Sequence, residues 1–231
     1  MSSYASDEEQ VEALKSWWNE NGTSLLTGVA LVLAVFFGMR QWQSENLSEA
    51  GNASDLYQQI AELSINSLSI QATPETVRDA MVFYTQLKNE YPDSIYTRYA
   101  AMSVAKFLVE TDQYEQAASE LQWILDNPDL GMFQDIDEEL FLIVRLRLAR
   151  IKLGIGDAQT ALALIHEVDP GPMTSAYADL EGDVLLSLGQ TDEAKAAYQK
   201  ALATNTSGNP VLLQLKLQDL GVSPVNLDPV L

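Results

Sequence analysis

A long run without charge dominates the hydropathy pattern of the chain. Residues 22–39 read GTSLLTGVALVLAVFFGM and contain no charged side chain, with Glu20 before the run and Arg40 after it. At 1.5 Å per residue this run forms a helix of roughly 27 Å, close to the roughly 30 Å hydrocarbon core of a bilayer. The pattern therefore predicts a membrane helix over residues 22–41, in contact with the lipid bilayer.

The flanks of this run favour an uncleaved anchor over a buried core helix or a cleaved signal peptide. Trp17, Trp18 and Trp42 stand on the two sides of the run, where indoles suit the headgroup regions. A signal peptide begins with basic residues, whereas the first 21 residues hold five acidic side chains against Lys15 alone. Lys15 and the amino terminus lie before the run and Arg40 lies after it, so the positive charges favour a cytoplasmic N-terminus by one charge.

After residue 42 the pattern changes to amphipathic helices that recur along the chain. Four alanines, Ala80, Ala117, Ala161 and Ala194, lie about 37, 44 and 33 residues apart, close to the tetratricopeptide period of about 34. The larger middle interval fits an inserted loop around residues 127–138. An ordinary helical bundle is the alternative.

The last repeat shows the pattern most clearly. Gly182 and Ala194 allow close contact between two helices, Tyr198 fills the space one turn on, and Gly189 ends the first helix. Pro210, after Asn209, suits the first turn of a final helix. The predicted fold is all-α, a single transmembrane helix followed by a tetratricopeptide-like solenoid. The expected segments are an acidic tail (1–21), the membrane helix (22–41), the repeat domain (42–221) and a C-terminal tail (222–231).

Composition and charge exclude several classes of function. The chain has 33 acidic and 13 basic residues, no cysteine and one histidine, with a net charge of −20. Such a charge disfavours nucleic acid as a partner, and so few soft ligands predict neither a metal site nor a cofactor. The acidic run Asp135, Asp137, Glu138 and Glu139 is typical of a helix start, and His166 of a surface residue. An interaction protein is therefore expected, with an enzyme as the second class.

Helical repeats bind partners on the concave face, which the first helix of each pair lines. Projecting the repeat register places a mixed set of aromatic, apolar and charged residues there. The predicted groove residues are Tyr99, Met102, Lys106, Leu146, Arg150, Asp179 and Asp183. The alternative for each is packing between repeats.

Small residues recur along the membrane segment. Ala30, Ala34 and Gly38 are spaced by four and form one stripe of the predicted helix. Small residues allow close approach of two helices in lipid, so this stripe is a candidate packing face. The alternative is that such residues are simply common in membrane helices.

Several segments, in their order along the chain, resemble the YfgM family of bacterial inner-membrane proteins, the ancillary subunits of the Sec translocon. They are residues 10–22 (QVEALKSWWNENG), 145–150 (RLRLAR), 178–186 (ADLEGDVLL) and 213–217 (LQLKL). The resemblance implies a cytoplasmic N-terminus, one inner-membrane helix and a periplasmic repeat domain. It also implies association with Sec translocon subunits and with a membrane-anchored periplasmic chaperone of the PpiD type.

The implied role is to pass emerging polypeptides, unfolded secretory or outer-membrane clients among them, to periplasmic chaperones, without catalytic residues. The alternative is a regulatory scaffold that binds a cytoplasmic signalling protein through residues 1–21. Whether clients or only chaperones occupy the groove is left open by the sequence.

Overall fold

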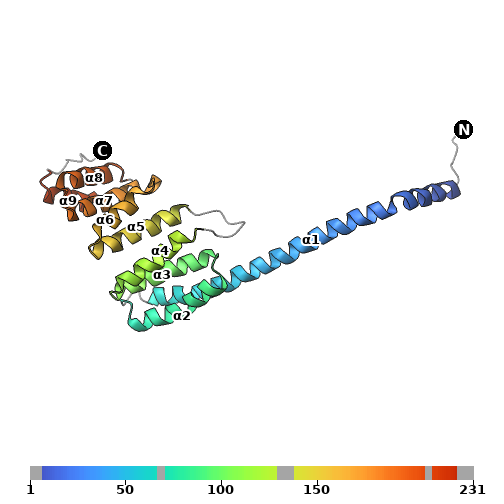
Figure 1. Cartoon of the computed structure of the whole chain (residues 1–231), viewed down its shortest axis with the longest axis horizontal. Coiled ribbons are helices and arrows are strands. Elements are labelled where there is room, and N and C mark those ends of the chain that lie inside the picture. Colours follow the sequence, from blue (N-terminus) through green and yellow to red (C-terminus); the bar gives the residue numbers. More distant parts are fainter. Residues whose placement is uncertain (1–6, 67–70, 129–137, 206–209, 223–231) are drawn as a thin grey trace, which may run out of the picture. The chain divides into compact units, whose positions relative to one another are not determined.

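A computed structural model of the chain describes residues 7–66, 71–128, 138–205 and 210–222. All regular elements in these ranges are helical, which confirms the predicted all-α class (Figure 1). The helices are α1 (Asp7–Asn66), α2 (Pro74–Glu90), α3 (Ile95–Glu110), α4 (Tyr114–Asp126), α5 (Glu138–Gly154), α6 (Ala158–His166), a short 3-10 turn (Gly171–Met173), α7 (Thr174–Ser187), α8 (Thr191–Ala203) and α9 (Pro210–Asp219). The chain divides into two compact units between Asn52 and Ala53.

The first unit consists of the long helix α1 up to Asn52. Its stretch from Gln10 to Trp42 is long and apolar enough to cross a membrane, and only 6% of its most apolar window is buried inside the protein. A core helix would instead be mostly buried, so the exposed apolar surface fits a lipid-facing segment. The predicted segment bounds stay predictions, since α1 continues as one helix well beyond residue 41.

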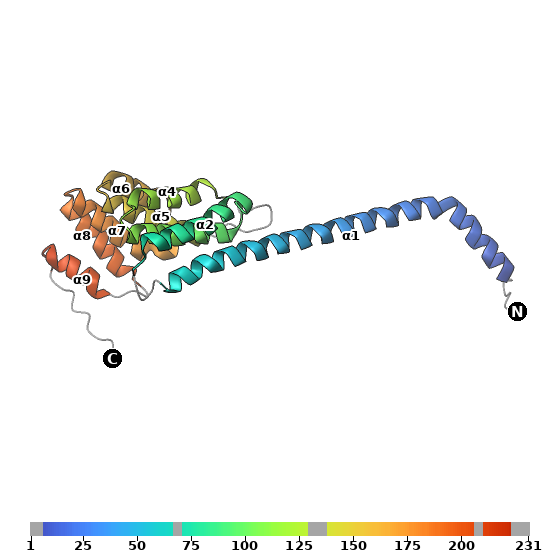
Figure 2. The same cartoon turned by 90° about the horizontal axis from the view of Figure 1, so that it is seen from below.

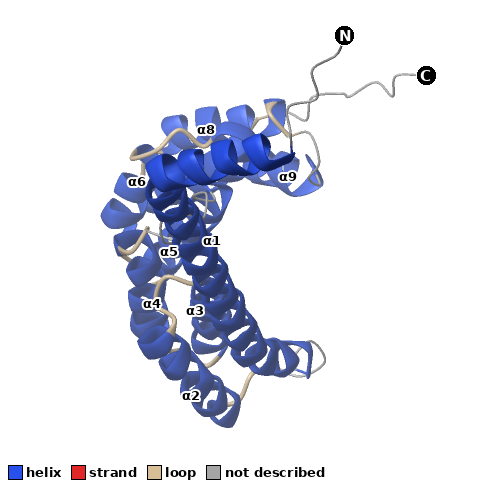
Figure 3. Cartoon of the chain, turned by 90° about the vertical axis from the view of Figure 1, so that its right-hand side faces the viewer, coloured by secondary structure: helices blue, strands red, loops and turns tan. Residues whose placement is uncertain are grey.

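The second unit, from Ala53 onward, is a stack of helix pairs. The pairs α3/α4, α5/α6 and α7/α8 follow one another, with α2 before them and α9 after α8 (Figures 1 and 2). Figure 3 shows α2, α4, α6 and α8 along the outer edge of a curved stack, with α3 and α5 on its inner side. We call this unit the repeat stack.

The same turn joins the two helices of each pair. Asp112, Gly156 and Gly189 adopt left-handed conformations, with φ of 60°, 84° and 77°. In each turn the next residue donates its backbone N–H to the carbonyl five positions earlier, over 2.8 to 2.9 Å. Left-handed residues with this bond end helices in the Schellman manner. Each one lies five residues before one of the aligned alanines, so the turn and the helix register repeat together.

Burial confirms the predicted register of the second helices. Ala80, Ala117, Ala161 and Ala194 all have 0% of their surface exposed. At Gly182, however, the nearest atoms belong to the ring of Tyr198, which lies so close that an added Cβ would stand 2.4 Å from Cε1. Glycine at 182 therefore makes room for this aromatic ring.

A buried arginine fixes the junction of three helices. Arg98 on α3 is fully buried and donates hydrogen bonds to the carbonyls of Pro92, Ser94 and Asn127 at 3.0, 3.1 and 2.7 Å. These carbonyls lie at the α2–α3 turn and just after α4. Through these bonds Arg98 links the segments that follow α2 and α4 to the start of α3.

The last predicted helix is present as α9, which begins at Pro210 and buries Leu213 and Leu217. The residue expected to cap it, Asn209, lies outside the described residues, as does most of the expected loop between α4 and α5. Glu138 and Glu139 stand in the first turn of α5, as the acidic run predicted. Asp135 and Asp137 lie outside the described residues.

Candidate functional site

The inner side of the repeat stack begins at α3, where the last turns of α1 cover it. Tyr57 of α1 packs against Tyr96 and Tyr99 of α3, with ring centroids 5.9 Å apart in both pairs. Ala53 and Ile60 of the same helix are fully buried in the core. Tyr99 is therefore half-buried under a segment of its own chain, and its predicted contact with a partner stays a prediction.

At the other end, α9 covers the predicted acidic residues of α7. The Lys216 ammonium lies 2.7 Å from Asp179 and 2.6 Å from Asp183, and the Tyr198 hydroxyl donates to Asp183 over 2.7 Å. Burial alone would lower the pKa of Lys216, but hydrogen bonds and charges from both aspartates outweigh burial and raise it. Lys216 thus satisfies carboxylates that the sequence assigned to a partner.

Between these covered ends, α3 and α5 border an open hollow of about 350 Å³. We call it the α3–α5 groove. It brings together three of the predicted residues, Met102, Lys106 and Arg150, with several apolar side chains. Its lining is Met102, Ala105, Lys106, Val109, Glu110, Leu121, Arg147, Arg150 and Ile151.

The register on α5 differs from the prediction at one position. Leu146 is only 4% exposed and belongs to the hydrophobic core, so it does not line the groove. Its neighbour Arg147 is exposed and does line it, three residues before Arg150. Residues three apart share a helix face, so Arg150 itself was the signal that could have identified Arg147.

The groove is electropositive although the chain is strongly acidic. Lys106 lies 3.4 Å from Glu110, whose other oxygen accepts the backbone N–H of Ala72 over 3.0 Å. Arg147 and Arg150 have no carboxylate within ion-pair distance in the described ranges. Partial burial and, secondly, the charge of Arg150 lower the pKa of Arg147. Two guanidinium groups therefore repel each other beside an apolar floor.

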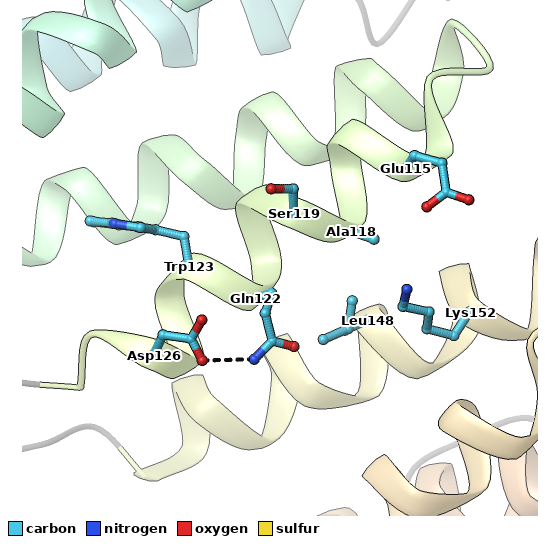
Figure 4. Close-up of a pocket in the computed structure, with 8 residues that line it drawn as sticks. All are labelled: Glu115, Ala118, Ser119, Gln122, Trp123, Asp126, Leu148 and Lys152. Atoms are coloured by element: carbon cyan, nitrogen blue, oxygen red, sulfur yellow. Dashed lines mark hydrogen bonds between the residues drawn. The ribbon is translucent and has the colours of Figure 1, made fainter.

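A second hollow, of about 420 Å³, lies between α4 and α5 (Figure 4). Glu115, Ser119, Gln122 and Asp126 line its α4 side, and Gln122 donates a 2.8 Å hydrogen bond to Asp126. Lys152 reaches it from a different face of α5 than the one that carries Arg147. This hollow is lined by both carboxylates and a cation, whereas cations predominate in the α3–α5 groove.

His166 and the small residues of the membrane segment complete the predicted positions. The Nε2 atom of His166 lies 2.7 Å from Glu181 at the surface between α6 and α7. Ala30, Ala34 and Gly38 are exposed along α1, and an added Cβ at Gly38 would meet nothing within 4 Å. Their role in helix packing stays a prediction.

A family described as "Tetratricopeptide repeat-like domain" matches residues 15–222, which is most of the chain. The chain belongs to this family. The tetratricopeptide-like solenoid predicted from the spacing of the alanines is thereby confirmed, and the ordinary bundle is not supported.

Curated relatives extend this likeness to nearly the full length of the tetratricopeptide-like chain. An "Ancillary SecYEG translocon subunit" of Escherichia coli (strain K12) is 29% identical over 223 residues, 96% of this chain and 100% of the relative. The protein of that name from Haemophilus influenzae is 26% identical over 93% of this chain and 97% of its own. That of Neisseria gonorrhoeae is 22% identical over 95% and 100%. The resemblance to the YfgM family is therefore confirmed.

Proposed function

We propose that this protein is a non-enzymatic subunit associated with the Sec translocon in the bacterial inner membrane, and that it passes emerging polypeptides to periplasmic chaperones. The observation that carries the proposal is the match over nearly the whole chain to relatives named ancillary SecYEG translocon subunit. In the described residues one apolar helix precedes the repeat stack, and this architecture supports the proposal because such a helix can tether a binding surface to the membrane.

The repeat stack supports a role in binding. Stacked helix pairs present an inner surface that suits extended peptides or a partner's helix. On this surface the described residues form the α3–α5 groove, where methionine and other apolar side chains lie beside cations. We assign this groove to emerging polypeptides or to a membrane-anchored chaperone of the PpiD type.

The topology that this function requires can be tested directly. The residues after the membrane segment should lie in the periplasm, with the N-terminus in the cytoplasm. A reporter enzyme active only in the periplasm, fused after Leu231, should be active, while a reporter active only in the cytoplasm should be silent. The reverse result would remove the chaperone role.

Co-purification tests the association itself. The full chain, extracted from membranes in mild detergent, should retain Sec translocon subunits and a PpiD-type chaperone. Replacing Met102 and Arg150 by alanine should release a partner held by the groove without changing the circular dichroism spectrum. Lys152→Ala is the matched control, because it removes a cation from another face of α5. If no translocon subunit co-purifies with the unmodified chain, the proposal is contradicted.

The membrane segment provides a second point of contact in this proposal. Ala34→Ile keeps the segment apolar, so insertion should be unchanged, while the larger side chain should weaken packing against another membrane helix. Co-purified membrane proteins should then decrease. If changing Ala30, Ala34 and Gly38 together to leucine leaves the complex intact, the segment is only a tether.

A further inference from the structure

The α3–α5 groove contains a concentration of positive charge that the fold itself does not use. Its two guanidinium groups, on Arg147 and Arg150, are exposed on one face of α5 and make no ion pair within the described part of the chain. Their neighbour Arg145, on another face of the same helix, pairs with Glu167. Unpaired cations on the groove side are notable in a chain with 33 acidic residues.

The floor between these cations is apolar. Leu121 is 1% exposed and Ile151 is 9% exposed, so both are supported from below by the core. Met102 and Val109 are half-buried and border the hollow. Methionine adapts its shape to different apolar partners, and an apolar surface flanked by charge fits a ligand that carries both characters.

The electrostatics indicate which charge that ligand carries. Arg147 and Arg150 repel each other, and partial burial adds to the cost of keeping Arg147 charged. A carboxylate would relieve this repulsion, and guanidinium groups bind carboxylates through two parallel hydrogen bonds. Glu110, the acidic residue of the groove, is already engaged by Lys106 and by the backbone of Ala72.

Resting on the proposed function, we propose that the α3–α5 groove selects apolar polypeptide segments that carry aspartate or glutamate side chains. Arg147 and Arg150 bind the carboxylates, while Met102, Val109 and Ile151 bind the adjacent apolar side chains. Charge complementarity is the reason for proposing acidic segments, since the groove is positive although the chain as a whole has a charge of −20. That overall charge repels acidic ligands elsewhere on the surface, so selection for acidic segments requires this local site.

The test uses the full chain in detergent and fluorescence anisotropy of short labelled peptides capped at both ends. One peptide carries leucines and two aspartates, and its matched forms carry two asparagines or two lysines instead. We expect the aspartate peptide to bind most tightly and its affinity to fall as salt is added. Equal or tighter binding of the lysine or asparagine peptide would overturn the proposal. Binding only by an uncapped peptide would also overturn it, because the groove would then recognise a chain end.

Variants locate the selectivity. Changing both Arg147 and Arg150 to glutamine should lower affinity for the aspartate peptide at least about tenfold, since hydrogen bonds to charged groups are lost. Affinity for the asparagine peptide should stay within about twofold. Lys152→Gln, on another face of α5, should bind both peptides as the unmodified chain does. An equal effect of Lys152→Gln would show that net charge, and not the groove, is responsible.

The same samples separate this inference from the proposed function. If the unmodified chain retains translocon subunits but shows no preference for the aspartate peptide, the inference fails and the proposed function stands. If it prefers the aspartate peptide but retains no translocon subunit, the proposed function fails. Met102→Ser should lower the affinity for the aspartate peptide and for the asparagine peptide to the same extent. If both affinities stay unchanged, the apolar floor does not take part in binding.

Discussion

Replacing Gly182 by alanine places one methyl group where α7 meets α8. The new Cβ would lie 2.4 Å from Cε1 and 2.5 Å from Cδ1 of Tyr198. Carbon atoms in favourable contact stay about 3.5 Å apart or more, so the ring has to move. It cannot move freely, because Tyr198 is 1% exposed and its hydroxyl donates to Asp183 over 2.7 Å.

The magnitude follows from opposing contributions. Alanine favours a helix over glycine by about 1 kcal/mol. Overpacking a buried site costs about 1 to 3 kcal/mol, and disturbing a hydrogen bond to a charged acceptor adds up to about 1.5 to 3 kcal/mol. The free energy of unfolding of the repeat stack should therefore fall by about 1.5 to 5 kcal/mol.

The fall in the free energy of unfolding is measured by unfolding the full chain with denaturant in detergent and monitoring the transition by far-ultraviolet circular dichroism. The decisive control is Gly182→Ala on a Tyr198→Ala background, where the ring is gone and only the helix preference remains. There the change should stabilise by about 1 kcal/mol, so its sign should reverse between backgrounds. The same destabilisation in both backgrounds, or stabilisation of the unmodified chain, would refute the assignment to Tyr198.

Three further substitutions test the register and the turns. Ala194→Leu should lower the free energy of unfolding by about 1 to 3 kcal/mol, because the site has no exposed surface, while the same change at exposed Ala196 should cost much less in the same melt. Gly156→Ala should cost about 1 to 2 kcal/mol for its left-handed backbone, whereas Gly154→Ala, at the last residue of α5 with open space around it, should be neutral or stabilising. The Asp157 side chain accepts hydrogen bonds from the residue three positions on, which lowers its pKa below the ordinary 3.8. Since the folded pKa is the lower one, its stabilisation is present above about pH 4 and lost as the pH falls further, so Asp157→Asn should flatten the stability profile below pH 4 only.

The repeat register was predictable because it depends on short-range spacing. Buried alanines recur at nearly the period of the helix pair, and the last three of them each follow a left-handed turn residue by five positions, so one pattern reports both helix packing and chain reversal. The position of α5 was harder to predict, because it follows a long connection that has no repeat spacing. The projection found Arg150 but took Leu146, which packs in the core, in place of Arg147, which lies about 100° away around the helix.

The covered ends of the inner face could not be predicted from spacing. Tyr57 lies on α1, before the first aligned alanine, and meets Tyr99 through a contact that no periodicity reports. Lys216 lies on α9, after the last repeat, and its pairing with Asp179 joins residues 37 positions apart. Projection along the repeats finds the face that each helix presents, but it cannot find which other segment of the chain lies on that face.

Coverage at both ends limits the footprint of any bound polypeptide. Neighbouring packed helices lie about 8 to 10 Å apart, so an opening bordered by α3 and α5 spans on the order of 20 Å. An extended chain covers this distance with about six residues. So short a footprint favours brief residence over tight capture, and a polypeptide held there would be released and rebound many times as it lengthens. Fast release would suit the proposed transfer of emerging polypeptides to chaperones.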